Sequence, residues 1–587
     1  MGEHINLRQA RTNTVLPKPS IGLVKVTFNC RKECSTKVMG LSHKVGLITV
    51  VLAACGTSAE VTDGGAVDAS ADVTLLDASL DAPHVTENIV VTVDATKTDV
   101  PFRDLVGVNK APRSWDGKAP NNEYDISAGY KALGISQVRI HDDRLDICAI
   151  YTDAKIEDYA SGSPVTVTTC TVDPIGGPPH LKWTVKNSAT VNDLANYRFD
   201  DLDASISATL AAGSKPYVRL GFNYNGPNDV GDIASWAKVA TNVYKHIIGA
   251  FGPSAVKVDP QYVEVFNEPD GAFWVGSKSD FASLFNATVD GVRAAAADAG
   301  KIVKVGGPGF TAEYLQKVNI AGSVANGFAS AVTPARLDFF SVHSYNKCDA
   351  AMLSTTETFF KNVRAQIDKE GLASKPMHIS EWNIGLGKGC GMNFFATAQV
   401  QSYASGVLTL MQDAAYNIDV GEFYSGAPPM SVFDFDQAQV GKVIVRPSAW
   451  SFWAHSRLVG GTRLATQVCS GGACGSSTAA KAPVIAIAGT VGTKRYAILT
   501  NDSASSVATT VRVTNASSGN FTVYVPPSAI QWVTATKSGS RYVMDATSMA
   551  ALAESIAPVT QPGVMANGGL ESNVTLAARS IALVQLP

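Results

Sequence analysis

The sequence YVEVFNEPD occupies residues 262–270, and the sequence HISEWN occupies residues 378–383. Each stretch opens as a short strand-like run and places a glutamate, Glu268 or Glu381, where the run ends. A single glutamate after a strand is most often a solvated residue or a helix cap. Two glutamates in matching settings indicate instead that strand ends meet at one place, as they do in sheets of parallel strands.

The pattern around these stretches repeats along the chain, because short apolar runs alternate with longer segments of helical period. Such alternation predicts βα units and a parallel sheet. The expected strands are residues 105–109, 137–141, 216–222, 262–266, 302–306, 339–343, 377–380 and 420–424. The expected helices include residues 233–251, 280–299, 354–370 and 396–414. Eight units over about 350 residues predict an α/β fold, a (β/α)₈ TIM barrel, with its chemistry at the C-terminal strand ends that form the mouth.

Additions to this barrel are expected at two places. Residues 142–196 are too many for a simple βα connection, so we expect a rim insertion within a barrel domain that spans residues 89–462. Over residues 463–587, short alternating runs separated by Gly, Ser, Asn and Pro predict an accessory antiparallel β-sandwich. The early run at residues 89–94 has the same character and is a candidate strand of that sandwich.

The N-terminus is typical of a targeting segment and not of a folded domain. From Met39 it has a cation at Lys44, an apolar core, and small residues directly before Cys55. This arrangement resembles a bacterial lipobox, whose cysteine is lipidated; the alternative is an apolar strand that ends in a buried cysteine. We expect residues 1–54 to be leader and signal peptide and residues 55–88 to be a disordered acidic tether. The protein would then be an exported lipoprotein of the cell envelope, at the outer membrane or cell surface.

The composition excludes several classes of protein. Lys and Arg number 48 against 51 Asp and Glu, so the net charge of −3 offers no basic surface for nucleic acid. No apolar run reaches the roughly 18–20 residues of a membrane span, which excludes a polytopic membrane protein. We therefore expect contact with a membrane only through the N-terminal lipid.

The cysteines also fit export. Six remain once Cys30, Cys34 and Cys55 are set aside, and an even set in an exported protein predicts three disulfides. Their spacings contain no paired CxxC and no nearby histidine pair, so no metal site is expected. Loops that follow adjacent strands meet, and bridged cysteines need Cα atoms within about 7 Å. The expected pairs are Cys148–Cys170, Cys348–Cys390 and Cys469–Cys474.

Two carboxylates at one barrel mouth are what cleavage of a glycosidic bond requires. One carboxyl group protonates the oxygen of the leaving group, and the other attacks or assists at the anomeric carbon. Glu268 and Glu381 stand three strands apart in the expected order, which suits such a pair.

At this point a resemblance to a known family becomes specific. Matching blocks occur in order at residues 131–142, 215–222, 262–270, 305–308, 338–345, 379–383 and 446–457. The chain resembles glycoside hydrolase family 39, a clan A family of retaining (β/α)₈ enzymes that includes β-xylosidases and α-L-iduronidases. The similarity covers about residues 89–463, and the tail resembles the accessory β-sandwich of that family. Asn-Glu-Pro is shared across the clan, whereas the Gly-Gly-Pro and Val-His-Ser-Tyr blocks narrow the resemblance to the family.

The resemblance implies roles for individual residues. Glu268 matches the general acid/base, and Glu381 matches the nucleophile. Asn267 matches the amide that binds the sugar 2-hydroxyl, a contact that strengthens in the transition state. Arg139 matches the second-strand arginine that keeps the nucleophile ionised.

Other residues fall at the mouth. His141, His343 and Tyr345 match positions that contact the nucleophile or the sugar; for the histidines, the alternatives are a rim residue with satisfied hydrogen bonds or a metal ligand. Trp382 follows the nucleophile and could stack on a sugar ring, although a packing role is an equal alternative.

The eighth strand departs from the family pattern. The family usually carries a tryptophan and an acidic residue there, whereas this chain offers Tyr424 in place of the tryptophan and Glu422 or Asp434 as the acid. This departure leaves the identity of the bound sugar open.

Together these features predict a retaining glycoside hydrolase that is β-xylosidase-like, acts on plant or bacterial polysaccharide or oligosaccharide, and needs no cofactor and no metal. An endo-acting exopolysaccharide hydrolase is one alternative. A surface carbohydrate-binding protein without activity is another, although the presence of both glutamates argues against it.

Overall fold

The computed structural model describes residues 89–116, 121–140, 145–159, 165–167, 180–222, 226–385, 389–476 and 483–587. These residues all belong to one unit of the chain, Ser79–Pro587. Several predictions concern residues outside the described ranges: the leader, the tether, lipidation of Cys55, the role of His141 and the pairing of Cys170. They stay predictions.

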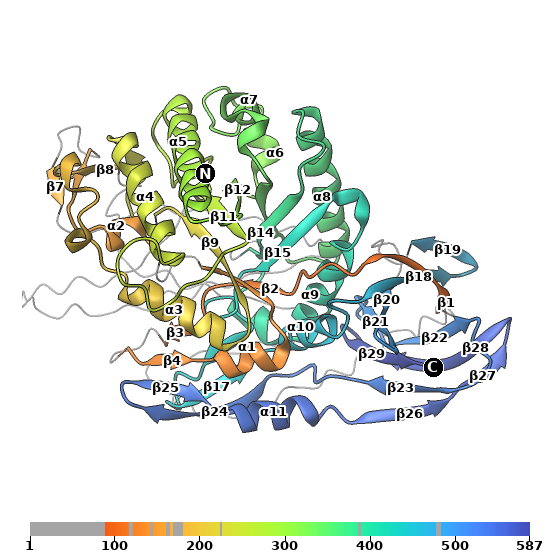
Figure 1. Cartoon of the computed structure of the whole chain (residues 1–587). Coiled ribbons are helices and arrows are strands. Elements are labelled where there is room, and N and C mark those ends of the chain that lie inside the picture. Colours follow the sequence, from red (N-terminus) through yellow and green to blue (C-terminus); the bar gives the residue numbers. More distant parts are fainter. Residues whose placement is uncertain are drawn as a thin grey trace, which may run out of the picture. The chain divides into compact units, whose positions relative to one another are not determined.

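A closed barrel of eight parallel strands confirms the predicted fold class (Figure 1). Around the barrel the strands are β2 (Gly107–Asn109), β5 (Gln137–Ile140), β9 (Lys215–Leu220), β11 (Tyr262–Val265), β12 (Lys304–Phe310), β13 (Phe340–Asn346), β14 (Met377–Ile384) and β15 (Ile418–Phe423). Each lies at or near a predicted strand. The largest differences are in β12, which starts and ends later, and in β14, which continues past the predicted end at residue 380.

The longer helices cover the outside of the barrel, as expected from their helical period (Figure 1). The helices are α1 (Ser127–Leu133), α2 (Ile147–Ile150), α3 (Asp200–Ala211), α4 (Ile233–Ile247), α5 (Lys278–Asp298), α6 (Tyr314–Lys317), α7 (Phe328–Val332), α8 (Met352–Lys369), α9 (Ala398–Leu410), α10 (Ala449–Ser456) and α11 (Ala546–Glu554). Short 3-10 helices are η1 (Ser188–Thr190), η2 (Leu194–Asn196), η3 (Pro334–Arg336), η4 (Met392–Ala396) and η5 (Ala414–Tyr416). Within the described part of the chain, no helix is both long enough and apolar enough to span a bilayer.

The segment that follows the second barrel strand contributes three strands to a small separate sheet. The order is β10 (Asp229–Val230), β8 (Leu181–Val185), β6 (Ala154–Asp158) and β7 (Val165–Val167). Asn228 connects this sheet to the loop after β11, because its backbone N–H donates to Leu181 and its side chain donates to the carbonyl of Ala272. The rim sheet therefore adjoins the loop that carries Glu268.

The C-terminal part forms the predicted sandwich, whose described strand pairs are antiparallel except for the parallel pair β1 and β22. Its path is β26 (Pro558–Pro562), β23 (Asn520–Tyr524), β29 (Ile581–Leu586), β21 (Lys494–Asn501), β20 (Val484–Val491), β18 (Thr462–Ser470), β1 (Ile89–Pro101), β22 (Val507–Thr514), β28 (Gly569–Leu576) and β27 (Val564–Ala566), with β19 (Ala473–Ser476) paired to β18. The candidate strand at residues 89–94 does belong here, since β1 pairs with β18 and β22. The sandwich strand β18 begins at Thr462, close to the predicted boundary, whereas β1, at the start of the range 89–462 expected to be barrel, belongs to the sandwich.

A further sheet was not predicted. Its order is β16 (Phe433–Phe435), β17 (Lys442–Val445), β24 (Gln531–Ser538), β25 (Arg541–Met544), β4 (Glu123–Asp125) and β3 (Arg113–Trp115). The outer members follow the first and last barrel strands, so they arise at the mouth, while β24 and β25 come from the C-terminal segment. Its inner face packs on the barrel through stacked rings, such as Tyr130 on Phe433 at 6.0 Å.

The barrel interior changes from apolar to charged along its axis. Tyr217, Tyr262, Phe339 and Val420 form a buried cluster of their own. Two residues further along β11 and β15, which is one inward-facing position, stand Glu264 and Glu422. The ionisable side chains of the barrel interior therefore begin one layer above this aromatic cluster, toward the mouth.

Two of the expected disulfides lie among the described residues. Cys348 and Cys390 are joined with Cα atoms 5.4 Å apart, which links the loops after β13 and β14. Cys469 and Cys474 are joined across β18 and β19, with Cα atoms 4.0 Å apart.

These two bridges should differ in what they contribute to stability. Cys348–Cys390 closes a sequence separation of 42 residues, and Cys469–Cys474 closes one of 5. In the chain-entropy account, a bridge over the longer loop removes more freedom from the unfolded chain, about 4 against about 2 kcal/mol. We expect the Cys348→Ser/Cys390→Ser variant to unfold at a lower temperature than Cys469→Ser/Cys474→Ser. Calorimetry measures both unfolding temperatures, and a lower temperature for Cys469→Ser/Cys474→Ser would contradict this prediction.

Candidate active site

The site is built around Arg139, a fully buried arginine on β5. Its Nε donates a hydrogen bond to Glu264 at 2.7 Å, and its Nη1 donates to Glu381 at 2.7 Å. Nη1 also donates to the side-chain oxygen of Asn109 at 2.9 Å, and Nη2 donates to that of Asn267 at 2.8 Å. One guanidinium therefore aligns side chains that come from opposite sides of the barrel.

Arg139 and its carboxylate partners stabilise each other's charged forms. Burial disfavours the charged form of Arg139, but Glu264 and Glu381 outweigh burial and raise its pKa. Burial likewise disfavours the carboxylate of Glu264, but Arg139 outweighs it and the pKa of Glu264 is lowered. Both groups stay ionised, and removal of either partner would leave an uncompensated buried charge.

Glu381 reaches the site through an irregularity in β14. Val342 pairs with Ile379, and the next residue, His343, pairs with Glu381, so Ser380 is an extra residue in β14. Such a bulge redirects the side chain that follows it. Glu381 is 5% exposed and accepts a hydrogen bond from the Tyr345 hydroxyl at 2.6 Å in addition to the one from Arg139. Its carboxylate is thereby held from both sides.

Glu268 lies across from it, on the loop after β11. Its carboxylate is 2.6 Å from Nδ1 of His343, and the same nitrogen is 3.5 Å from Glu381. Burial of the imidazole disfavours its charge, but Glu381 and Glu268 outweigh burial and raise the pKa of His343 above the ordinary 6.5. With 23% of its side chain exposed, Glu268 is the more accessible of the two carboxylates.

The separation of the two glutamates decides what they can do. Carboxylate oxygens of Glu268 and Glu381 lie within 4.8 Å of each other. Glycosidases that retain configuration place their carboxyl groups about 5–5.5 Å apart, whereas inverting enzymes need roughly 6.5–9.5 Å to admit a water. The short distance between the oxygens fits the retaining arrangement, in which one carboxylate attacks directly.

Glu268, His343 and Glu381 are also the one group of described residues close enough to bind a metal ion together. The donor set does not favour that use, because the guanidinium of Arg139 lies 2.7 Å from Glu381 and would repel a cation. The imidazole nitrogen that a metal would take already faces both carboxylates. The three groups are better suited to proton transfer and covalent chemistry.

The structure brings together most of the predicted mouth residues. Those in or beside the cluster are Arg139, Asn267, Glu268, His343, Tyr345, Glu381 and Tyr424. Tyr424 is placed there by its ring, which lies edge-on to Tyr345 at 6.2 Å.

The prediction that Trp382 could stack on a sugar is corrected. Its indole is fully buried and packs against Tyr403, Phe423 and Phe452. Because β14 continues to Ile384, residues alternate across it, and the residue after the inward-facing Glu381 points out toward the helices. The packing alternative was the right one.

The acidic residues expected to bind the sugar also lie elsewhere. Glu422 is fully buried against Gly107, and burial raises its pKa well above 4.5, so it is a neutral acid inside the barrel. Asp434 lies on β16 in the unpredicted sheet and forms an ion pair with Arg446. Neither side chain hydrogen-bonds to the cluster: the Glu422 carboxyl oxygens have no hydrogen-bond partner among the described residues, and Asp434 is paired with Arg446.

Comparison with known proteins bears directly on this geometry. Residues 185–409 match the model of the family described as glycosyl hydrolases family 39. The predicted resemblance is confirmed. The predicted enzyme class, a glycosidase, is confirmed with it, and the matched residues include both glutamates. No curated protein matches the chain.

Solved structures similar to this glycosidase share its architecture. A glucosidase from Croceicoccus marinus is 16% identical with a TM-score of 0.57, and the match covers 85% of this chain and 98% of that one. The GH39 enzyme from Xanthomonas axonopodis pv. citri is 16% identical with a TM-score of 0.52, over 84% and 96%. A monomeric β-xylosidase from Caulobacter crescentus CB15 is 17% identical with a TM-score of 0.50, over 84% and 99%. At these identities the likeness establishes the fold.

The sequence of this glycosidase did not lead us to predict two residues of the site, Asn109 and Glu264. Glu264 interrupts the apolar run of β11, and a charged residue inside a buried strand must have a partner, so its position was a usable signal. Asn109 ends β2 and donates to the backbone carbonyls of Ser380 and Glu422, which ties the first strand to the last two. No local sequence signal distinguishes it from a turn residue.

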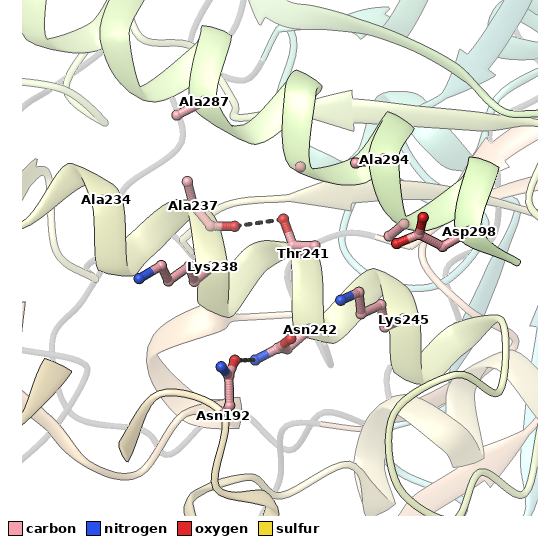
Figure 2. Close-up of a pocket in the computed structure, with 12 residues that line it drawn as sticks. Asn192, Ala234, Ala237, Lys238, Thr241, Asn242, Lys245, Ala287, Ala294 and Asp298 are labelled. Atoms are coloured by element: carbon pink, nitrogen blue, oxygen red, sulfur yellow. Dashed lines mark hydrogen bonds between the residues drawn. The ribbon is translucent and has the colours of Figure 1, made fainter. Parts of the chain in front are cut away.

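A hollow of about 460 Å³ lies elsewhere on the glycosidase, between α4 and α5 (Figure 2). Thr241 of α4 lies against Gly291 of α5, whereas Asn242 points away from α5 and donates to Asn192 at 3.1 Å. None of its lining residues belongs to the group around Arg139. The hollow is therefore separate from the catalytic cluster.

The raised pKa of His343 makes a prediction about stability and pH. A histidine whose pKa is higher in the folded state stabilises the fold fully below pH 6.5, and this contribution is lost as the pH rises through the folded pKa. We therefore expect the difference in free energy of unfolding between the wild type and His343→Gln to shrink as the pH rises above 6.5. Chemical denaturation at a series of pH values measures this difference.

His455 provides the control, because burial lowers its pKa to about 3 and it stays neutral throughout this range. The difference between the wild type and His455→Gln should be flat above pH 6.5. A flat difference for His343 as well would contradict its proposed charge.

Proposed function

We propose that this glycosidase cleaves O-glycosidic bonds of a plant or bacterial polysaccharide or oligosaccharide by double displacement, with retention of configuration. The observation that carries the proposal is the pair Glu268 and Glu381, whose oxygens lie within 4.8 Å of each other. Glu381 accepts hydrogen bonds from the Arg139 guanidinium and the Tyr345 hydroxyl, which fix its carboxyl group in the position of a nucleophile. Glu268 is the more exposed, which suits a group that exchanges protons with the leaving group and with water.

In the first step, a carboxylate oxygen of Glu381 attacks the anomeric carbon while the carboxyl proton of Glu268 passes to the departing oxygen. A covalent glycosyl-enzyme ester forms, and the aglycone leaves as an alcohol. Glu381 loses its charge in this ester while Glu268 becomes a carboxylate, so the negative charge next to the His343 imidazole moves from Glu381 to Glu268. The balance of charge around Glu268 therefore changes between the two steps.

In the second step, Glu268 is a carboxylate and takes a proton from an incoming water, which attacks the anomeric carbon. Glu381 is released as an anion and Glu268 is again protonated, so the site returns to its starting state. Two inversions at one carbon give overall retention.

Asn267 supports the same proposal. Its side-chain oxygen accepts from Arg139, and its amide nitrogen is buried with no hydrogen-bond partner among the described residues. A buried donor without a partner is costly. The role implied by the family resemblance, donation to the sugar 2-hydroxyl, would satisfy it.

For the sugar itself we propose a β-xylosidase-like preference. The support is the resemblance of the chain to family 39 and the likeness of its fold to a β-xylosidase. A panel of aryl β-D-glycosides, including the xyloside, glucoside and galactoside, tests it through kcat/KM. A highest value for any sugar other than xylose would overturn the preference and leave the retaining mechanism intact.

The assignment of roles to the glutamates is tested by two variants. Glu268→Ala should lower kcat/KM for substrates with poor leaving groups by about 10²–10⁴-fold, yet spare activated dinitrophenyl glycosides, which need little acid assistance. Glu381→Ala should abolish hydrolysis of both, with azide restoring turnover only to an inverted glycosyl azide. The reverse pattern would exchange the two roles. Loss of neither activity would contradict the proposal.

We propose further that the enzyme is anchored to the cell envelope through lipid on Cys55. The support is the run Leu52-Ala53-Ala54-Cys55 after an apolar core, and the following Gly56 favours delivery to an outer membrane over retention at an inner one.

Cys55→Ser should release the enzyme from the membrane fraction in active form, because the acidic tether separates the anchor from the barrel. Cell fractionation with an activity assay measures this release. Cys34→Ser, which lies upstream of Met39, is the matched control and should leave the enzyme with the membranes. Mass spectrometry that finds Cys55 unmodified would contradict the anchor.

A further inference from the structure

The loop that carries Glu268 has an unusual backbone. Phe266 has a φ of +79° and Glu268 has a φ of +43°, although neither is a glycine. Such conformations cost of order 1–3 kcal/mol each and persist only where the surroundings hold them. The position of the proposed acid/base therefore depends on contacts that keep this loop in place.

Some of these contacts come from the core below the loop. Phe266 is 1% exposed, and its backbone N–H donates to Leu220 of β9 at 2.7 Å. Its ring packs edge-on against Trp274 and Phe281 at 5.7 and 5.3 Å. The start of the loop is thereby fixed.

The far side of the loop is held by the end of β12. The backbone N–H of Glu268 donates to the carbonyl of Gly309 at 2.9 Å. Two residues later, the Asp270 carboxylate accepts from the backbone N–H of Thr311 at 3.0 Å and from its hydroxyl at 2.8 Å. Asp270 is 7% exposed, so both oxygens of a buried carboxylate are used by one residue.

Thr311 is itself a rigid partner. Phe310, directly before it, is fully buried and packs on Tyr314 and Phe340 at 5.1 and 5.5 Å. The carbonyl of Thr311 accepts from the backbone N–H of Tyr314 at 2.9 Å. Any movement of Asp270 away from Thr311 would break two hydrogen bonds to a group that cannot follow.

Gly271 allows the turn after Glu268 to approach Thr311 closely. A β-carbon at this position would lie 3.1 Å from the Thr311 methyl group and 3.3 Å from the carbonyl oxygen of Glu268. The N–H of Gly271 also donates to that carbonyl at 2.9 Å. The turn after Glu268 thus closes directly onto Thr311.

We propose that Asp270 is a positioning residue for the general acid/base: clamped on Thr311, it holds the strained backbone of Glu268 so that the carboxyl group meets the leaving oxygen. The proposal rests on the proposed function. Asp270 acts through Glu268 and does not itself touch the sugar.

A positioning role has a specific kinetic consequence. Displacement of a catalytic group by about 1 Å can cost about 10²-fold in rate. The loss should fall on the step that needs acid assistance and should spare reactions in which the leaving group departs unaided. A residue that merely stabilised the fold would instead lower the rate equally for all substrates.

The experiment compares kcat/KM for a series of aryl glycosides of graded leaving-group pKa, using the xyloside or whichever sugar the wild type prefers. Asp270→Ala is expected to lower kcat/KM by about 10–100-fold for the poorest leaving group and by less than about 3-fold for the dinitrophenyl glycoside. Thr311→Val, which removes only the hydroxyl bond, should show a smaller effect in the same direction. Thr311→Ser restores the hydroxyl and should behave as the wild type. If Asp270→Ala does not fold, the comparison of Thr311→Val with Thr311→Ser tests the proposal, and equal dependence on the leaving group in both variants would overturn it.

Asp338→Ala is the matched structural control. Asp338 accepts a backbone N–H near the start of β12, that of Val305 at 2.8 Å, whereas Asp270 binds Thr311 directly after the end of that strand. Its loss should lower stability without changing the dependence on the leaving group. A uniform loss across the series for Asp270→Ala, or no loss, would overturn the proposal.

Failure of the proposed function would look different. If the wild type hydrolyses no aryl glycoside of the panel, or Glu268→Ala shows no dependence on the leaving group, the function itself is wrong. If Glu268→Ala shows that dependence and Asp270→Ala does not, only the role of Asp270 fails.

Discussion

The burial of one guanidinium is the constraint on which the site depends. Arg139 is fully enclosed, and a cation in that position is tolerated only with carboxylates in direct contact. Two such carboxylates meet it, Glu264 from β11 and Glu381 from β14. Removal of one partner of such a pair typically costs about 3–5 kcal/mol. The carboxylate of Glu381, the proposed nucleophile, is therefore held by the same ion pair that stabilises the buried charge of Arg139, so its position is coupled to the stability of the fold.

Much of this arrangement was open to prediction from the sequence because it depends on local periodicity. The eight strands follow from apolar runs between helical segments, and the two glutamates follow from where those runs end. The clustering of Arg139, Asn267, His343 and Tyr345 follows from the family resemblance, since their positions within the matched blocks carry it. Strand positions, strand ends and motif matches can each be recognised within a short stretch of sequence.

What was missed depends on the register between strands. The bulge at Ser380 exists only relative to β13, and it decides that Glu381 points inward and Trp382 outward. Glu422 was expected at the mouth, but its strand starts earlier and places it inside the barrel, where a carboxyl group without a partner stays neutral. The sheet that combines β3 and β4 with β24 and β25 joins residues more than 400 positions apart, and no local pattern encodes such a pairing.

That sheet has a consequence for how the enzyme is made. Its central strands come from residues 531–544, while its outer strands are supplied by the loops after the first and last barrel strands. On the ribosome, the barrel strands all emerge before β24 and β25 exist, so β17 and β4 present open edges until about the last tenth of the chain arrives. The mouth is thus completed late in synthesis. A chain shortened before residue 531 would keep both glutamates and all eight barrel strands, and would still carry two exposed strand edges beside its catalytic centre.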